Sequence, residues 1–239
     1  MIFKVVVFLF MVSSAWCKVI LIDPGHGGTD FGAQGVLHTN KKQLVFEKNY
    51  SLKMATLLRD ILQKKHQVYL TRVNDSYISL DARARMADTV KADLFISIHF
   101  NSSTDKTAQG IETFYLDNHD DVAVKKVEAV ENVELVGKDS IINRILIDLS
   151  IKMTTKQSKS LAALVHQQAL STVRKKFHIK DRGAKAGLLY VLALSKRPGV
   201  LIEGGFMSHA HEVNKIVSSD FLELYAQGIS KGINSYLEK

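Results

Sequence analysis

The chain has 239 residues, of which 46% are hydrophobic and only two are proline. This length and composition suit one large domain with a buried core and exclude a chain dominated by disorder. The formal net charge of +8 indicates affinity for anionic surfaces, but the sequence contains no recognisable nucleic-acid-binding motif, so we expect no nucleic-acid partner.

The N-terminus has the layout of an export signal. Lys4 gives a short basic start, an unbroken apolar run covers Val5–Val12, and small residues follow in Ser13–Cys17. We therefore predict a signal peptide over residues 1–17 and an exported mature chain without a transmembrane anchor, since the run is too short to span a bilayer. The alternative is a buried N-terminal strand, because valine and phenylalanine favour strands.

The rest of the chain alternates short apolar runs with helix-like periodic segments. The runs predict strands at Lys18–Ile22, Gln67–Thr71, Leu94–Ile98, Ile111–Leu116, Leu188–Leu192 and Val200–Ile202. The periodic segments predict helices at Asn49–Lys65, Leu80–Thr89, Ser160–Val173 and Ser219–Leu237. This alternation predicts a single α/β domain over residues 18–239, with a mainly parallel, twisted sheet and helices on both faces.

Residues 117–157 interrupt the alternation. A compact domain needs only a short loop here, yet the chain carries amphipathic stretches at Val124–Leu135 and Ile141–Ile151. The apolar spacing of the second stretch predicts a helical insertion that covers a functional site.

Three side chains at the ends of predicted elements form a candidate metal-ligand set. His26 lies between glycines directly after the first strand, Glu47 stands near the start of a predicted helix, and His99 ends the strand at Leu94–Ile98. Two imidazoles and one carboxylate leave a tetrahedral zinc ion with one open position for water, whose pKa falls to about 7. Taken singly, His26 is compatible with a plain turn residue and Glu47 with a surface charge.

Glu203 follows the apolar strand at Val200–Ile202 and precedes two glycines. A carboxyl group between a hydrophobic strand and a glycine turn is expected to have a raised pKa. Such a group suits a general base that later acts as an acid toward a leaving amine.

Four ordered motifs resemble the signature blocks of the zinc-dependent N-acetylmuramoyl-L-alanine amidases of the amidase type 3 family. They are Leu21–Gly28, Glu47–Asn49, Ala92–Asn101 and Leu201–Ser208. The resemblance implies that His26, Glu47 and His99 hold one zinc ion and that Glu203 is the catalytic carboxylate. It also implies hydrolysis of the amide between N-acetylmuramic acid and the L-alanine of the stem peptide, in peptidoglycan or in its lipid-linked precursor.

The insertion is similar to that of the Gram-negative cell-division amidases. In that subgroup a helix covers the active site and places a glutamate on the zinc until a protein activator displaces it. The resemblance implies a periplasmic protein with Glu131 in this blocking role. Glu128, Glu131 and Glu134 also have the spacing of a solvated helix face, and this alternative stays open.

Two further alternatives concern the activity itself. Ser103 and Lys106 have the Ser-x-x-Lys spacing of penicillin-binding serine enzymes, where the lysine takes the serine proton. This spacing raises the possibility of a second, penicillin-sensitive carboxypeptidase activity through an acyl-enzyme. The other alternative is a non-catalytic peptidoglycan-binding protein.

Overall fold

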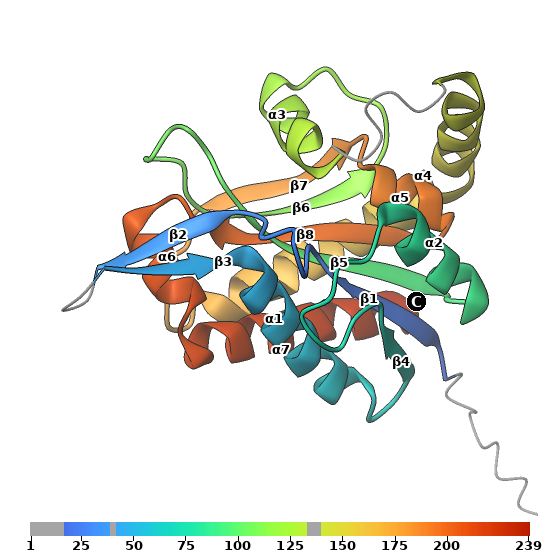
Figure 1. Ribbon diagram of the computed structural model, residues 1–239. Helices are drawn as coiled ribbons and strands as arrows, with labels where there is room; N and C mark the ends of the chain where they lie inside the picture. Colours follow the sequence, from blue (N-terminus) through green and yellow to red (C-terminus); the bar gives the residue numbers. More distant parts are fainter. Residues whose placement is uncertain (1–16, 39–41, 133–139) are drawn as a thin grey trace, which may run out of the picture.

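A six-stranded sheet with the order β4-β1-β5-β8-β6-β7 runs through the computed structural model, which describes residues 17–38, 42–132 and 140–239 (Figure 1). The strands β4, β1, β5 and β8 are parallel to one another, β6 pairs with β8 in the antiparallel sense, and β7 is parallel to β6. The predicted mainly parallel sheet is confirmed. The strands of this sheet are β1 (Val19–Pro24), β4 (Gln67–Leu70), β5 (Leu94–Asn101), β6 (Ile111–Leu116), β7 (Asp181–Gly187) and β8 (Gly199–Phe206).

Helices cover both faces of the sheet, as predicted (Figure 1). One face packs against α1 (Glu47–Leu62), α4 (Ser140–Val173) and α7 (Ser219–Leu237), and the larger hydrophobic core lies between them and the sheet. The other face packs against α2 (Leu80–Thr89) and α5 (Tyr190–Ser195) over a smaller core, to which α3 (Val122–Glu131) contributes Val124. None of the helices in the described part of the chain has the length and hydropathy needed to cross a bilayer.

The two central strands carry the side chains of greatest interest. All eight residues of β5 and all eight of β8 are buried, because helices or loops cover both faces of the sheet. Strands in such a position read as continuous apolar runs, so a polar side chain within them is conspicuous. His99 and Glu203 are both of this kind, and they lie side by side in the register of β5 and β8.

The structure corrects three predicted elements. The predicted strand at Leu188–Leu192 is wrong: β7 ends at Gly187, and α5 begins at Tyr190. A short apolar run fits a buried helix as well as a strand, and Leu192 packs in the smaller core. The predicted helices at Ile141–Ile151 and Ser160–Val173 are parts of one helix, α4, so no structural break follows residue 157. The glycines after Glu203 continue β8 and do not form the predicted turn.

An antiparallel hairpin of β2 (Gln34–His38) and β3 (Lys42–Phe46) was not predicted from the sequence. Its inward-facing residues Leu37 and Val45 are buried, whereas Val36 and Leu44 are exposed. Apolar side chains on both faces weaken the alternation that marks a half-buried strand. A further short helix, α6 (Ala210–Ile216), follows β8. Residues 1–16 of the predicted signal peptide and residues 133–139 of the predicted insertion lie outside the described residues.

Candidate active site

His26 lies in the turn after β1, in the left-handed backbone region with a φ of 59°. Its Nδ1 lies 2.8 Å from Asp30 Oδ2, and its Nε2 lies 3.1 Å from Glu47 Oε2. The buried guanidinium of Arg83 donates to the carbonyl oxygen of His26 at 2.9 Å and to Asp23 Oδ1 at 2.6 Å. A non-glycine residue in this region is strained, and these contacts hold the turn in place.

Glu47 is the first residue of α1 and is buried between the two histidines. Its Oε1 accepts a hydrogen bond from the backbone N–H of Phe100 at 2.8 Å, and its Oε2 accepts one from that of Ala33 at 2.7 Å. Its Oε1 also lies 3.1 Å from His99 Nδ1. Backbone donors from two other segments therefore fix the orientation of this carboxylate.

Two glycines allow the backbone to lie against these side chains. A Cβ atom at Gly25 would lie 2.3 Å from the ring of His99. At Gly32, which has a φ of +63°, a Cβ atom would lie 2.6 Å from both Glu47 Oε2 and His26 Cδ2. Any larger residue at either position would displace the histidines or the carboxylate, so the glycines are required by close approach.

The donor atoms of this cluster fit a metal ion. His26 Nε2 and His99 Nδ1 are buried and have no hydrogen-bond partner among the described residues. A carboxylate oxygen of Glu131 lies with these two nitrogens in a group whose members are all within 4.8 Å of one another. Both nitrogens face a carboxylate oxygen of Glu47 at 3.1 Å without hydrogen-bond geometry. Imidazole nitrogens with carboxylate oxygens are the donors that zinc takes in hydrolytic sites.

The opposite charges of the histidines and the carboxylates set the pKa values of His26 and Glu47 when no metal is bound. Burial disfavours the charged form of His26, but the negative charge of Glu47 and the hydrogen bond with Asp30 outweigh it and raise the pKa of His26 to about 12. Burial likewise opposes ionisation of Glu47, but the two histidines hold the pKa of that carboxyl well below its usual range. His26 therefore carries a proton at neutral pH that a bound metal must displace.

Glu203 lies next to His99 in the β5–β8 register and is buried. Its Oε2 has no hydrogen-bond partner among the described residues. Burial, together with the negative charges of Glu131 and Glu47, raises the pKa of Glu203 well above its ordinary value. A buried carboxyl group with a raised pKa is a suitable carrier for a proton that moves between reacting atoms.

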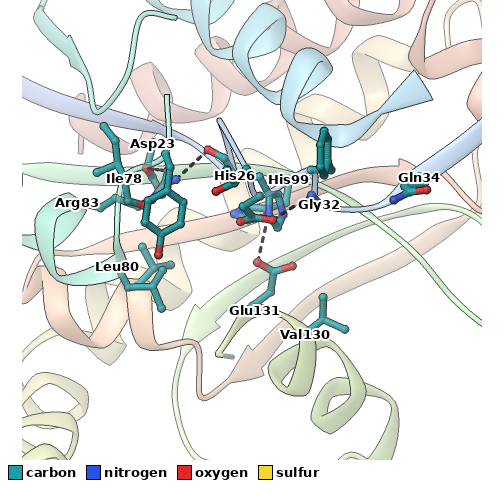
Figure 2. Close-up of a pocket in the computed structure, with 16 residues that line it drawn as sticks. Asp23, His26, Gly32, Gln34, Ile78, Leu80, Arg83, His99, Val130 and Glu131 are labelled. Carbon is teal, nitrogen blue, oxygen red and sulfur yellow. Dashed lines mark hydrogen bonds and ion pairs between the residues drawn. The ribbon is translucent and has the colours of Figure 1, made fainter. Parts of the chain in front are cut away.

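Glu131 is the last residue of α3, and its carboxylate points toward His26 and His99 (Figure 2). Its Oε2 lies 3.1 Å from His99 Nδ1, and burial raises the pKa of its carboxyl. The side chains of both acidic residues of α3 are largely covered, at 11% exposed for Glu131 and 14% for Glu128, so neither lies on a solvated face. The described geometry thus favours the blocking position over the solvated face for Glu131.

Hydrogen bonds anchor α3 on the segment between β7 and α5. Asn132 Nδ2 donates to the carbonyl oxygen of Leu188 at 2.8 Å, and Asn132 Oδ1 accepts from the backbone N–H of Tyr190 at 2.9 Å. Glu128 Oε1 accepts from the backbone N–H of Leu188 and contacts His119 Nε2. These contacts hold the end of α3, and with it Glu131, over the histidines.

A cavity of about 450 Å³ opens beside the cluster. Its polar wall includes His26, His99, Glu131 and Arg83, and Figure 2 shows these side chains around the opening. The lining also includes the larger apolar or aromatic residues Tyr77, Ile78, Leu80, Val130 and Val191. The helix α3 therefore narrows a groove that leads to the two histidines.

Ser103 and Lys106 do not form a catalytic pair in the described structure. They lie in a turn after β5, and Ser103 Oγ accepts a hydrogen bond from the backbone N–H of Asp105 at 3.1 Å. The backbone N–H of Ser103 donates to Ser208 Oγ. The Ser-x-x-Lys hypothesis needs the lysine nitrogen at the serine hydroxyl, and this contact does not occur between the two residues.

Two residues near the site were not predicted from the sequence. Asp30, which orients His26, lies four residues after it, and that spacing was an available signal. Glu112 lies opposite Glu203 in the antiparallel β6–β8 pair, where it accepts a hydrogen bond from Asn101 and pairs with basic side chains of β7. Nothing in the sequence places β6 beside β8, so Glu112 was not identifiable in this way.

Comparison with known proteins agrees with the geometry. Residues 20–235 match the family model of the N-acetylmuramoyl-L-alanine amidases. The chain is 31% identical over 228 residues to the N-acetylmuramoyl-L-alanine amidase AmiC of Escherichia coli O6:H1, and this match covers 91% of the chain and 52% of AmiC. The chain thus spans about half the length of that relative.

Solved structures of amidases have the same fold. An N-acetylmuramoyl-L-alanine amidase from Clostridium difficile 630 superposes with a TM-score of 0.71 at 30% identity, and the match covers 93% of this chain and 98% of that one. The CwlD amidase from Clostridioides difficile, whose structure was solved in complex with the GerS lipoprotein, superposes with a TM-score of 0.65 at 25% identity over 92% of this chain and 98% of that one.

Proposed function

This chain belongs to the N-acetylmuramoyl-L-alanine amidase family, and we propose that it hydrolyses the amide bond between N-acetylmuramic acid and L-alanine with the help of one zinc ion. The observation that carries the proposal is the convergence of His26, Glu47 and His99 beside the buried carboxyl of Glu203. These four side chains come from four separate segments, and burial of so many ionisable groups at one point is costly unless they serve a site.

We assign His26 Nε2, His99 Nδ1 and the Glu47 carboxylate as the zinc ligands. Asp30 accepts from His26 Nδ1 and so presents Nε2 to the metal, and the backbone donors of Phe100 and Ala33 orient Glu47. When bound, the zinc ion activates a water molecule and polarises the substrate carbonyl.

Glu203 is the proton carrier in this proposal. The Glu203 carboxylate takes a proton from the attacking water and then delivers it to the nitrogen of the leaving L-alanine. Its buried position next to His99 excludes solvent from this transfer. The products are a muramoyl carboxylate and a stem peptide with a new amino terminus.

The contact between Glu131 and His99 supports a resting state in which α3 covers the site. In this state the Glu131 carboxylate stands where substrate must approach, and release of the anchors at Leu188 and Tyr190 opens the groove. A protein partner that binds the insertion is the natural trigger, and the CwlD amidase offers a precedent for an amidase in complex with another protein.

We further propose that the protein is exported to the periplasm and acts there in wall remodelling during cell division. The apolar N-terminal segment and the excess of basic residues support this setting, since the wall and its precursors are anionic. Both polymeric peptidoglycan and the lipid-linked precursor have the scissile amide, so both are candidate substrates.

One experiment tests the activity and separates it from wall binding alone. Purified full-length protein is incubated with zinc and either peptidoglycan or the lipid-linked precursor, with and without a chelator, and the products are identified by mass spectrometry. We expect free stem peptides that begin with L-alanine, lost on chelation and in Glu203→Gln. Binding to peptidoglycan without release of stem peptides, in the full chain and in Glu131→Ala, would instead support the non-catalytic alternative.

A further inference from the structure

Four side chains form a row across the sheet that begins at the proposed zinc site. His99 of β5 is the register partner of Glu203 of β8, and Glu203 is the register partner of Glu112 of β6. Register partners project from the same face of a sheet. Arg182 of β7 extends the row, because its Nε lies 3.1 Å from Glu112 Oε2. Nothing in the proposed reaction uses Glu112 or Arg182.

Arg182 is held rigidly by contacts that leave its outer end unused. Besides the ion pair at Nε, its guanidinium stacks on the ring of Phe206, with the Cζ atom 5.0 Å from the ring centroid. The side chain is 22% exposed, and among the described residues its guanidinium pairs with a carboxylate only at Nε, which makes no hydrogen bond. A fixed guanidinium with two parallel donors is the usual receptor for a carboxylate.

The charges around Arg182 also favour an anionic ligand. Glu112 Oε2 is shared by Arg182 and by Lys185, whose Nζ lies at 2.7 Å, and Glu112 Oε1 accepts from Asn101 at 2.8 Å. Two basic side chains thus face one carboxylate, which leaves the group one positive charge in excess. Lys185 Nζ donates to Glu112, so the terminal nitrogens of the Arg182 guanidinium are the donors left for a ligand.

The proposed role of Glu203 sets the direction of the substrate. Because Glu203 gives its proton to the leaving amine, the peptide half of the substrate lies on the Glu203 side of the zinc ligands. The row continues from Glu203 toward Arg182, two strands away, or about 10 Å between strand axes. A group on the second residue of the peptide lies about 7 Å from the leaving nitrogen, since consecutive Cα atoms are about 3.8 Å apart. The arginine side chain is long enough to bridge the gap of about 3 Å between these two distances.

We propose that Arg182 is a specificity residue that binds the free carboxylate on the second residue of the stem peptide. In peptidoglycan that residue is a D-glutamate joined through its γ-carboxyl, so its α-carboxylate is free unless the cell converts it to an amide. Arg182 thus distinguishes the acid from the amide form of the substrate. This inference rests on the proposed amidase function, because it takes the orientation of the substrate from Glu203.

The test compares two synthetic muramoyl pentapeptides that differ only in D-isoglutamate or D-isoglutamine at the second position. Zinc-loaded full chain carrying Glu131→Ala, so that α3 does not limit access, is measured with Arg182 intact and as Arg182→Gln or Arg182→Lys. We expect kcat/KM to favour the acid by about tenfold or more with Arg182 intact. Arg182→Gln should remove the preference by lowering kcat/KM for the acid more than for the amide, and Arg182→Lys should retain part of it.

Arg59→Gln is the matched control, because Arg59 is partly exposed on α1 and pairs with its neighbour Asp60. It should leave the preference intact. Equal turnover of both substrates with Arg182 intact, or an equal loss on both in Arg182→Gln, would overturn the proposal.

A binding measurement keeps this inference separate from the amidase function. The peptides L-Ala-D-isoGlu-L-Lys and L-Ala-D-isoGln-L-Lys are titrated into the same proteins and followed by NMR. Tighter binding of the acid that disappears in Arg182→Gln supports the carboxylate site even if no hydrolysis is found. Equal affinity for both peptides refutes it even if the amidase is active.

Discussion

Glu203 and Glu112 lie directly opposite each other on β8 and β6, yet their surroundings differ. Glu112 accepts from Asn101 and pairs with Lys185 and Arg182, whereas Glu203 Oε2 has no hydrogen-bond partner in the described part of the chain. Two buried carboxyl groups side by side repel when both are ionised, and Lys185 and Arg182 contact Glu112 and not Glu203. Without a metal ion the proton of the pair therefore belongs on Glu203, next to the proposed zinc ligands.

Glu203→Gln should abolish catalysis without loss of the fold or the metal. The amide has nearly the same shape but cannot take and return a proton, and general acid–base transfer contributes about 10²–10⁴-fold to rate. Release of stem peptides should fall by at least this factor, while zinc content and circular dichroism stay unchanged. An active Glu203→Gln would show that another group carries the proton.

Stability of the metal-free protein should respond to pH through the same residue. Burial and the charges of Glu131 and Glu47 raise the pKa of Glu203 in the folded state, whereas the unfolded chain keeps the ordinary value of about 4.3. At a pH below that value, Glu203 is protonated in both the folded and the unfolded state, so it does not lower the free energy of unfolding. As pH rises above it, the unfolded state loses the proton first, so this residue destabilises the fold increasingly.

Glu203→Gln removes this titration. The free energy of unfolding is measured in urea with a chelator present, at pH 4.5 and at pH 7.5. Between these two pH values, the stability of the variant relative to the wild type should increase by about 1.4 kcal/mol for each unit by which the pKa of Glu203 is raised. A difference between the two proteins that is the same at both pH values would contradict the raised pKa.

Zinc binding should release protons at neutral pH. Glu47 and Asp30 raise the pKa of His26 to about 12 against the effect of burial, so metal-free His26 is protonated at pH 7, and zinc requires its neutral form. Calorimetry at pH 7 in buffers of different ionisation enthalpy should report about one proton or more released per zinc ion. The same count in Glu203→Gln would assign the release to the ligands, whereas a count of zero would refute the protonated cluster.

The candidate site residues were easier to single out in the sequence than several of the elements around them. Glycines that lie against the histidines, and polar residues within apolar strands, are local features, so His26, His99 and Glu203 stood out without knowledge of the fold. Contacts that depend on which strands pair could not be predicted in this way. Glu112 acquires its neighbours because β6 pairs antiparallel to β8, and no local pattern specifies that pairing.

The wrongly predicted elements depend on the surroundings of each segment in the fold and not on its sequence pattern alone. The run from Leu188 is apolar enough for a strand, but it packs as the short helix α5 because β7 has already completed the edge of the sheet. The helix α4 extends from the predicted insertion into the larger core, and its outward face carries Ile145, Leu149 and Met153 in exposed positions. Because the described residues in the first half of α4 are largely exposed and its second half packs in the core, the apolar pattern changes along the helix and predicts two separate helices.

Removal of the Glu131 carboxylate should raise basal activity. In the resting geometry this group lies 3.1 Å from His99 Nδ1 and competes with the substrate for the site. Glu131→Ala should therefore increase the rate of stem-peptide release by about tenfold or more in the absence of any partner. Lys125→Ala, on the exposed side of the same helix, is the matched control and should leave the rate unchanged. Lower activity in a folded Glu131→Ala would assign the residue to catalysis.

Asn132 should control how often α3 leaves the site. Its amide makes two hydrogen bonds to backbone groups of Leu188 and Tyr190, each worth about 0.5–1.5 kcal/mol, and alanine replaces neither. Asn132→Ala should raise basal activity by about fivefold to 150-fold and speed hydrogen exchange in α3, while the exchange of β5 and β8 stays slow. Asn118→Ala, an exposed position before the helix, serves as the control. Faster exchange in α3 without a gain in activity would mean that the helix does not block the site, because the anchor would then have been loosened without any effect on access to the zinc ligands.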